Sequence, residues 1–455
     1  MKKSAGFSDS FVWGVASAAY QIEGAATADG KGPSVWDMFC RKPGTIWGGQ
    51  NGDVACDHYH RYATDVTLMG ELGIRAYRFS LSWPRILPDG VGTPNPQGLD
   101  YYDRLVDALL AAGVTPWVTL FHWDYPLALY HQGGWLNPNS PEWFAEYTRV
   151  VVERLSDRVK HWMTLNEPQC FIGLGMQTGY HAPGDRLCLD EVLQAAHHTL
   201  LAHGRAVQTI RAEAKQKPTI GFAPVGLTCM PATESPADID AARRAMFTVQ
   251  KSDCFSNTWW MDPVFLGHYP EDGLALFGAA APRVRAGDMA TIAQPLDFFG
   301  ANIYNGRIMR AGSAGVPEEV PAPAGYPKTT QDFWPVRPTS LYWGPRFFHE
   351  RYGLPIVITE NGHQNADVIH LDGKVHDPQR IDFLHRYLRE LKRAAIDGVP
   401  VEGYFQWCFT DNFEWAAGDA IRVGLVYTDY PTQQRIPKDS AYWYRDVIRN
   451  NGTNL

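Results

Sequence analysis

Two glutamates in this sequence each follow a run of residues that reads as a β-strand. Glu167 ends HWMTLNEP, where Pro168 stops the strand, and Glu360 lies in PIVITENG. A pair of carboxyl groups facing one cavity is what cleavage of a glycosidic bond requires. One group protonates the departing oxygen, and the other attacks or stabilises the oxocarbenium-like sugar. These residues therefore predict sugar chemistry if the fold brings the two carboxyl groups together.

The surroundings of the two glutamates are expected to give them different roles. Trp162 and other aromatic residues would desolvate the Glu167 carboxyl, which raises its pKa toward that of a general acid. Arg78, within a neighbouring strand run, supplies a cation that would keep Glu360 ionised. We therefore expect Glu167 to be the acid/base and Glu360 to be the second, ionised carboxylate.

Other strand runs also end in polar side chains that a purely structural strand does not need. Any one of them could cap the following helix, but helix capping does not account for the whole set. Because they come from different strands, a closed sheet would aim them into one mouth. The set, apart from the two glutamates, is Gln21, Arg78, His122, Asn166, Asn302 and Tyr304.

Sugars also need aromatic faces for their C–H surfaces, and the chain has 16 Trp and 21 Tyr. The segment QWCFTDNFEW just past the last strand run places Glu414 beside Trp415, with Trp407 near its start. A carboxylate between aromatic residues suits a hydroxyl ligand in a sugar pocket. Core packing accounts equally well for either tryptophan taken alone.

The elements that would position these residues alternate between short strands and longer helices, which is typical of βα units around a parallel sheet. The helical periods end at glycines, as Tyr62, Val66, Met69 and Leu72 do at Gly73. We predict a single (β/α)8 TIM barrel over residues 1–455, with extended βα loops at the C-terminal face. The longest irregular segment, Arg310 to Pro338, is expected to be one of these loops. The predicted strands are 11–20, 76–83, 115–123, 161–168, 219–226, 296–304, 355–362 and 401–409.

The composition of the chain argues against several classes of function and partner. A net charge of -8 without a basic run argues against a nucleic-acid partner, and no apolar stretch approaches the length of a membrane span. The seven cysteines are odd in number and form no CxxC pair, which argues against a disulfide framework and a zinc site and favours a reducing cytoplasm. Two lysines before an apolar run loosely resemble a signal peptide, but Phe7 to Asp9 interrupt the junction, so a first buried strand is favoured.

Nine motifs, in order across nearly the whole chain, resemble those of family 1 glycoside hydrolases: QIEGA, GKGPSVWDMF, GDVACDHYHRY, YRFSLSWPRI, LFHWDYP, TLNEP, FFGANIY, ITENG and DNFEWAAG. The resemblance implies a (β/α)8 barrel, retention of anomeric configuration and no cofactor. It implies Glu167 as acid/base and Glu360 as nucleophile, with Tyr304 and Arg78 steadying the latter. The implied ligands of the glycone hydroxyls are Gln21, His122, Asn166, Glu414 and Trp415. Trp407 is implied as the ring on which the sugar stacks, and Asn302 as part of the same hydrogen-bond network. Trp334 is implied on the aglycone side of the cleft.

The resemblance also narrows the substrate. Members acting on 6-phosphosugars replace the Glu414-type residue, and members acting on glucosinolates carry glutamine at the Glu167 position, whereas this chain keeps both glutamates. We expect an exo-acting β-glucosidase that removes terminal glucosyl residues from cello-oligosaccharides and from aryl and alkyl glucosides. The chain departs from the common pattern at Gln169 and Cys170, after TLNEP, and at Asp419 and Val423. These changes leave the ranking of glucose, galactose and fucose open.

Four other hypotheses remain. A glycosidase acting mainly as a transglycosylase would use the same carboxylates. A non-catalytic sugar-binding barrel would not need both of them, and a Schiff-base aldolase would need a lysine at a strand end, where none stands. A metal-dependent hydrolase is suggested by two histidine groups, but both lie in predicted helices: His58 with His60, and His197 with His198 and His203. The oligomeric state is not predicted.

Overall fold

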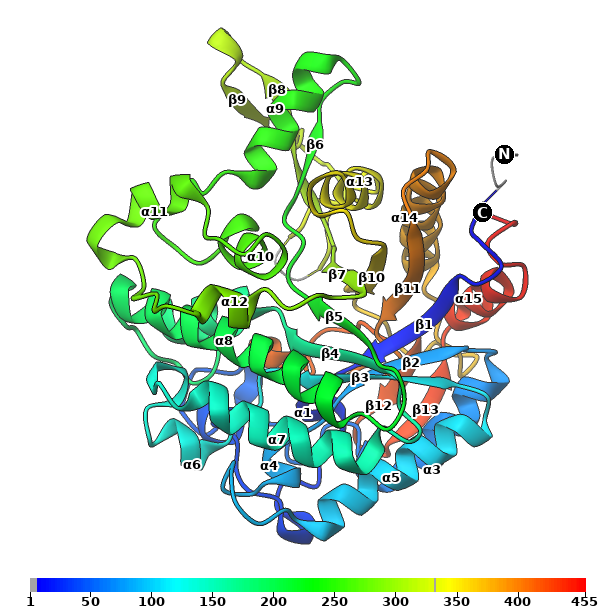
Figure 1. Ribbon diagram of the computed structural model, residues 1–455. Coiled ribbons are helices and arrows are strands. Elements are labelled where there is room, and N and C mark those ends of the chain that lie inside the picture. Colours follow the sequence, from blue (N-terminus) through cyan, green and yellow to red (C-terminus); the bar gives the residue numbers. More distant parts are fainter. Residues whose placement is uncertain (1–5, 331–332) are drawn as a thin grey trace.

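The computed structural model in Figure 1 describes residues 6–330 and 333–455. Its centre is a closed barrel in the order β1-β11-β10-β7-β5-β4-β3-β2, and every neighbouring pair is parallel. All eight predicted strands are present, each somewhat shorter than its run, so the predicted TIM barrel is confirmed. The barrel strands are β1 (Val12–Ser17), β2 (Ala76–Ser80), β3 (Thr115–Phe121), β4 (His161–Asn166), β5 (Thr219–Ala223), β7 (Phe298–Asn302), β10 (Ile356–Asn361) and β11 (Val401–Trp407).

Helices surround the barrel on its outer side, as Figure 1 shows for α3, α5, α7, α8, α13, α14 and α15. The predicted stripe in α3 faces the core, since Val66 and Met69 are buried, and Gly73 follows the helix with φ +68, in the left-handed region. The helices are α1 (Ala19–Ile22), α2 (Val35–Phe39), α3 (His58–Glu71), α4 (Trp83–Ile86), α5 (Pro96–Ala111), α6 (Leu127–Tyr130), α7 (Ser140–Leu155), α8 (Leu189–Glu213), α9 (Pro236–Phe247), α10 (Thr258–Phe265), α11 (Glu271–Phe277), α12 (Asp288–Ile292), α13 (Ser340–Tyr352), α14 (Pro378–Ile396) and α15 (Asp439–Arg449).

Two layers of side chains stabilise this arrangement. A large apolar cluster fills the space between sheet and helices, and a smaller cluster occupies the barrel interior. In the interior, Trp117 packs against Phe298 and Phe405, with ring centroids 5.5 Å and 5.1 Å apart. These large rings fill the barrel, so the C-terminal ends of the strands are left to form a site.

A small second sheet stands outside the barrel. It joins β6 (Thr228–Pro231), β8 (Gly306–Ala311) and β9 (Pro317–Val320), and Figure 1 shows it together with α9 projecting from the barrel. The prediction of an irregular segment from Arg310 to Pro338 is therefore wrong at its start, where β8 and β9 form an antiparallel hairpin. A second hairpin, β12 (Val426–Asp429) with β13 (Gln434–Pro437), follows the last barrel strand.

The loops after β10 and β11 are joined by buried charges, which we call the Lys438 network: Asp367, Asp377, Arg380, Asp411 and Lys438. Lys438 Nζ lies 2.6 Å from Asp367 Oδ2 and 2.7 Å from Asp411 Oδ1. Arg380, on α14, pairs with Asp367 at 2.7 Å and also with Asp377. All five side chains are fully buried. The network therefore fixes the loops after β10 and β11 relative to each other.

In the part of the chain that the structure describes, no helix has the length and apolar character needed to cross a membrane. The histidines behind the metal hypothesis lie in α3 and α8 as predicted, and their partners are within the protein. His58 Nδ1 lies 2.7 Å from Asp65, and His197 lies 2.9 Å from Tyr269 and 3.0 Å from Asp288. A search of residues 6–330 and 333–455 finds no group of three or more His, Cys, Asp or Glu that could hold a metal ion.

Candidate active site

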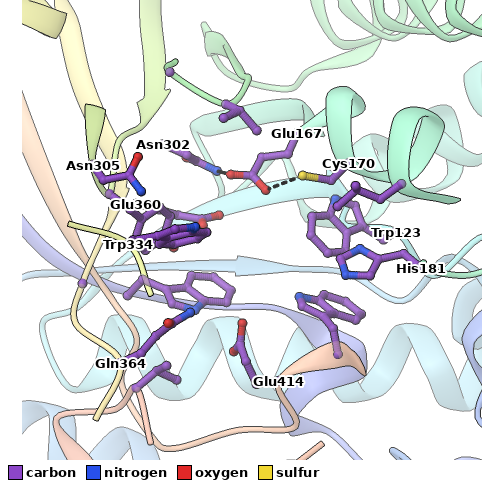
Figure 2. Close-up of a pocket in the computed structure, with 18 of the residues that line it drawn as sticks. Trp123, Glu167, Cys170, His181, Asn302, Asn305, Trp334, Glu360, Gln364 and Glu414 are labelled. Carbon is purple, nitrogen blue, oxygen red and sulfur yellow. Dashed lines mark hydrogen bonds between the residues drawn. The ribbon is translucent and has the colours of Figure 1, made fainter. Parts of the chain in front are cut away.

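A cavity of about 440 Å³ opens at the C-terminal ends of the barrel strands. Figure 2 shows its lining, with Glu167 and Cys170 on one side and Gln364 and Glu414 on the opposite side. Residues predicted from six separate segments of the chain meet in this one space. The predicted residues that line it are His122, Glu167, Asn302, Tyr304, Trp334, Glu360, Trp407, Glu414 and Trp415.

Glu360, on β10, is buried and held from two sides. Arg78 Nη1 donates to its Oε1 at 2.6 Å, and the Tyr304 hydroxyl donates to its Oε2 at 2.7 Å. Burial raises the pKa of Glu360, while Arg78 and Tyr304 act in the opposite direction by stabilising the carboxylate. Both oxygens therefore have donors suited to the ionised form.

Glu167 follows β4 directly, and the chain bends sharply to present it. Between Met163 and Asn166 the register of β4 against β5 shifts, and Glu167 itself has φ +46, in the left-handed region. Its backbone N–H donates to Ala223 O at 2.9 Å, which fixes the bend against β5. Register shifts next to active sites turn side chains in new directions, and such backbone strain persists only where surrounding contacts hold it.

The carboxyl group of Glu167 lies in a different environment from that of Glu360. Asn302 Nδ2 donates to its Oε1 at 3.0 Å, and the Cys170 thiol donates to its Oε2 at 3.4 Å. Burial and the nearby charge of Glu360 raise the pKa of Glu167 to about 8. A group with this pKa holds its proton at neutral pH, as a general acid must.

The predicted cause of this shift is only partly right. Trp162 does not line the cavity. Its neighbour Met163 lies in the barrel interior, whereas Thr164, two residues further on, contacts His203 of α8 at 2.6 Å. Because side chains alternate along a strand, Trp162 faces the helices with Thr164. Other groups desolvate Glu167.

A network behind the cavity wall connects the two glutamates. Asn302 Nδ2 also donates to Asn166 Oδ1 at 3.0 Å, and Arg78 donates to that same oxygen. Asn166 Nδ2 lies 3.1 Å from His122 Nε2, and burial lowers the pKa of His122 well below its ordinary value, which keeps the ring neutral. Arg78 and Asn166 are buried behind the lining residues.

The floor of the cavity combines aromatic rings with polar groups. Trp415 lies with its ring centroid 4.4 Å from that of Trp123 and 5.9 Å from that of His122. Gln21, which is buried behind the wall, donates from Nε2 to Glu414 Oε2 at 3.2 Å. The floor can therefore offer a carboxylate, an imidazole and indole faces to a polyhydroxylated ring.

The outer part of the cavity is more apolar and more exposed. His122, Trp407 and Trp415 at the floor are buried, whereas Tyr180 is 52% exposed and the other rim residues are partly exposed. Trp334 is part of this rim, with its ring centroid 5.7 Å from that of Tyr304. The rim residues are Leu174, Tyr180, Val225, Leu227, Phe255 and Trp334. The cavity therefore opens on this side.

Several lining residues were not singled out from the sequence, including Trp123, His181, Asn305 and Gln364. They lie in loops, which have no periodic pattern that would predict their direction. Of the four departures noted in the sequence, Gln169 and Asp419 are not among the residues that line the cavity. Cys170 and Val423 line the cavity, while the amide of Gln169 exchanges two 3.2 Å hydrogen bonds with the backbone of Val225.

Comparison with known proteins shows the family to which the chain belongs. The profile of glycosyl hydrolase family 1 matches residues 3–453. The chain is 44% identical to Beta-glucosidase A of Thermotoga maritima over 98% of both chains, and 43% identical to the Beta-glucosidase of an Agrobacterium species, covering 97% of this chain and 95% of that one. The structure of the Thermotoga maritima β-glucosidase in complex with glucoimidazole superimposes with a TM-score of 0.89 at 43% identity, covering 99% and 100% of the two chains. The chain belongs to glycosyl hydrolase family 1.

Proposed function

We propose that this protein is a retaining, exo-acting β-glucosidase that removes terminal β-D-glucosyl residues from cello-oligosaccharides and from aryl and alkyl glucosides. The observation that carries the proposal is the unequal environment of the carboxyl pair. Arg78 and Tyr304 both donate to Glu360, whereas the pKa of Glu167 is raised to about 8. The Glu360 carboxylate is thus prepared to attack the sugar, and the Glu167 carboxylic acid is prepared to protonate the leaving oxygen.

In the proposed reaction Glu360 attacks the anomeric carbon as the bond to the leaving oxygen breaks. Glu167 gives its proton to that oxygen, and a glycosyl ester forms on Glu360. Water then enters, Glu167 takes one of its protons, and the remaining hydroxide displaces Glu360 from the anomeric carbon. Two inversions at the anomeric carbon give net retention of its configuration, and Glu167 is protonated again at the end.

The shape of the cavity and the relatives support the choice of substrate. The floor, where Trp407 and Trp415 are buried and Glu414 is half-buried, suits one terminal sugar, and the rim suits the group that leaves. Structures of the Thermotoga maritima β-glucosidase hold glucoimidazole, deoxynojirimycin and galacto-hydroximolactam. These inhibitors support a glucose-like ring in the floor and leave room for the galactose configuration.

We also propose that residues 1–455 act as one catalytic domain. The strands that close the barrel come from opposite ends of the chain, and each candidate side chain is supplied from within it. All seven cysteines are free thiols, which supports the reducing cytoplasm as the place of action.

The test uses Glu360→Ala and Glu167→Ala with azide and an aryl β-glucoside that has a good leaving group. We expect Glu360→Ala with azide to give α-glucosyl azide, because only one displacement at the anomeric carbon remains. Glu167→Ala with azide should give β-glucosyl azide, because both displacements still occur. NMR of the products assigns the anomers. Glu319→Ala, at the exposed position of β9, is the control and should keep wild-type turnover. Wild-type turnover by both active-site variants would show that the assignment is wrong.

A further inference from the structure

The thiol of Cys170 contacts the acid/base glutamate but has no part in the reaction described so far. Its sulfur lies 3.4 Å from Glu167 Oε2, as the dashed line in Figure 2 shows, and the residue lines the cavity with 8% of its surface exposed. Burial and the nearby charges of Glu167 and Glu360 raise the pKa of Cys170 well above that of an ordinary cysteine. The sulfur therefore stays protonated and acts as a donor.

The backbone fixes the sulfur next to the carboxyl group. The Cys170 N–H donates to Glu167 O at 2.9 Å, which closes a turn between the two residues. Cys170 is the second residue of the π-helical segment Gln169–Gln177, and Gln169 ties the start of this segment to Val225 through two 3.2 Å hydrogen bonds. Segments of π-helix occur frequently at functional sites. The thiol is thus held beside Glu167 before any substrate binds.

A second contact of the carboxyl group decides which of its oxygens carries the proton. The Thr359 hydroxyl donates to Asn302 Oδ1 at 2.6 Å, so the Asn302 amide presents its N–H group to Glu167 Oε1 at 3.0 Å. An amide N–H group is a donor only, and a proton on Oε1 would point at it. The acid proton therefore belongs on Oε2, which is the oxygen in contact with Cys170.

A thiol suits an oxygen that must hold a proton and then release it. The S–H group is a weak donor and the sulfur is a weak acceptor, so Cys170 can contact Oε2 in both protonation states of Glu167. A hydroxyl at this position would be a stronger donor and would stabilise the carboxylate relative to the acid. An apolar side chain would leave Oε2 of the carboxylate without this donor.

We propose that Cys170 is a positioning residue for the acid/base: its thiol holds the proton-bearing Oε2 of Glu167 in place and, as a weak donor, sets the pH above which the acid is lost. The inference rests on the proposed glycosidase function. It assigns Cys170 a role in proton transfer to the leaving oxygen, exerted through Glu167 rather than by contact with the reacting atoms.

The other titratable groups around Glu167 come from three different barrel strands or their ends. They are Arg78 of β2, Tyr304 after β7 and Glu360 of β10. None of them is altered when Cys170 is replaced. A change in the pH limit of a Cys170 variant can therefore be assigned to the side chain at that position.

The test measures kcat/KM against pH for Cys170→Ala and Cys170→Ser with an alkyl glucoside, whose leaving oxygen needs the proton. Cys170→Ala removes a donor to the carboxylate, so the acid should hold its proton to a higher pH and the alkaline limb should move up by about half a pH unit. Cys170→Ser supplies a stronger donor, so the limb should move down by about half a pH unit. A general loss of structure would not move the limb in opposite directions.

Two controls separate this role from damage to the fold. The leaving group of 2,4-dinitrophenyl β-D-glucoside needs no proton, so its kcat/KM should stay within about twofold of the wild-type value in both variants. Cys188→Ala is the matched control, because the Cys188 thiol also donates to a glutamate three residues further on, Glu191 at 2.9 Å, but does not line the cavity. It should keep the wild-type profile. Equal losses on both substrates, or limbs that stay in place or move in the same direction, would refute the positioning role.

Infrared spectroscopy tests the hydrogen bond without relying on turnover. The S–H stretching band of Cys170 is obtained as the difference between the spectra of the wild type and Cys170→Ala. We expect this band to move to lower frequency as Glu167 ionises, because a carboxylate is a stronger acceptor than a carboxylic acid. In Glu167→Gln the band should not move with pH, and a band that is equally insensitive in the wild type would overturn the proposal. If the wild type hydrolyses neither glucoside although the band moves, it is the glycosidase proposal that fails, and the catalytic role of Cys170 with it.

Discussion

Burial raises the pKa of both carboxyl groups, and the neighbouring donors decide which of the two keeps its proton more firmly. Arg78 and Tyr304 contact Glu360, while Glu167 receives an amide and a thiol hydrogen bond. Ionising Glu167 as well would place two negative charges in one buried cavity. The proton therefore belongs on Glu167, the carboxyl group nearest to Cys170.

This assignment sets the pH dependence of the reaction. Glu167 must be protonated to act as acid, and its raised pKa of about 8 means that it is protonated below that pH and ionised above it. We expect kcat/KM for an alkyl glucoside, whose leaving group needs a proton, to fall above about pH 8. The profile of glucose release from pH 4 to pH 10 tests this. An alkaline limb that survives in Glu167→Gln would assign it to another group.

At the scale of elements, the Lys438 network holds the loops that carry Gln364 and Glu414. Burial alone would raise the pKa of Asp367, but Lys438 and Arg380 lower it, so the carboxylate is ionised in the folded state. A lowered pKa stabilises the fold above the ordinary titration range of Asp. This contribution disappears as the pH falls through the folded-state pKa.

Lys438→Met should therefore be strongly destabilising, because it leaves the carboxylates of Asp367 and Asp411 buried without their shared cation. We expect a loss of about 3–5 kcal/mol in the free energy of unfolding, measured with urea at pH 7. Arg310→Ala breaks the exposed pair with Glu318, at 3.1 Å, and serves as the control with a loss below about 1 kcal/mol. Equal effects of the two substitutions would contradict a structural role for the network.

The sequence predicted the elements better than the loops between them. Strands and helices have periods of their own, so all eight barrel strands and the face of α3 could be predicted locally. The direction of Trp162 could not, because it depends on which face of β4 turns inward. The β8–β9 hairpin was missed because GRIMRA has no clear alternation, and Gln364 because only the bridge of Asn365 with Arg422 shows where its loop lies.

At the scale of the whole molecule, closure of the barrel joins the two ends of the chain. β1 pairs with β11, so that Val12 lies opposite Gly403, and α15 packs near the chain start through the Tyr444 hydroxyl, which donates to Gly14 O at 2.8 Å. Neither half of the chain can complete the sheet without the other. Loss of either end would open the barrel and expose its interior cluster.

We therefore expect one cooperative unfolding transition in calorimetry, and deoxynojirimycin should raise its midpoint. If the inhibitor is present at 100 times its Kd, the stabilisation should be about 2.7 kcal/mol. Glu414→Gln should weaken this shift if Glu414 binds the sugar, whereas Glu319→Ala should not. Two separate transitions, only one of which responds to the inhibitor, would indicate two independently folding units.

The rim of the cavity has a consequence for the order of events in turnover. In the proposed reaction the sugar lies on the floor of the cavity and the leaving group at its exposed side, so the leaving group departs first, while the sugar is still bonded to Glu360. Water must then arrive through the space just vacated, and the freed sugar is the last to leave. The empty enzyme is the only form to which both new substrate and returning glucose bind. Glucose should consequently act as a competitive inhibitor. An alcohol that reaches the glycosyl ester before water does should accept the sugar instead of water.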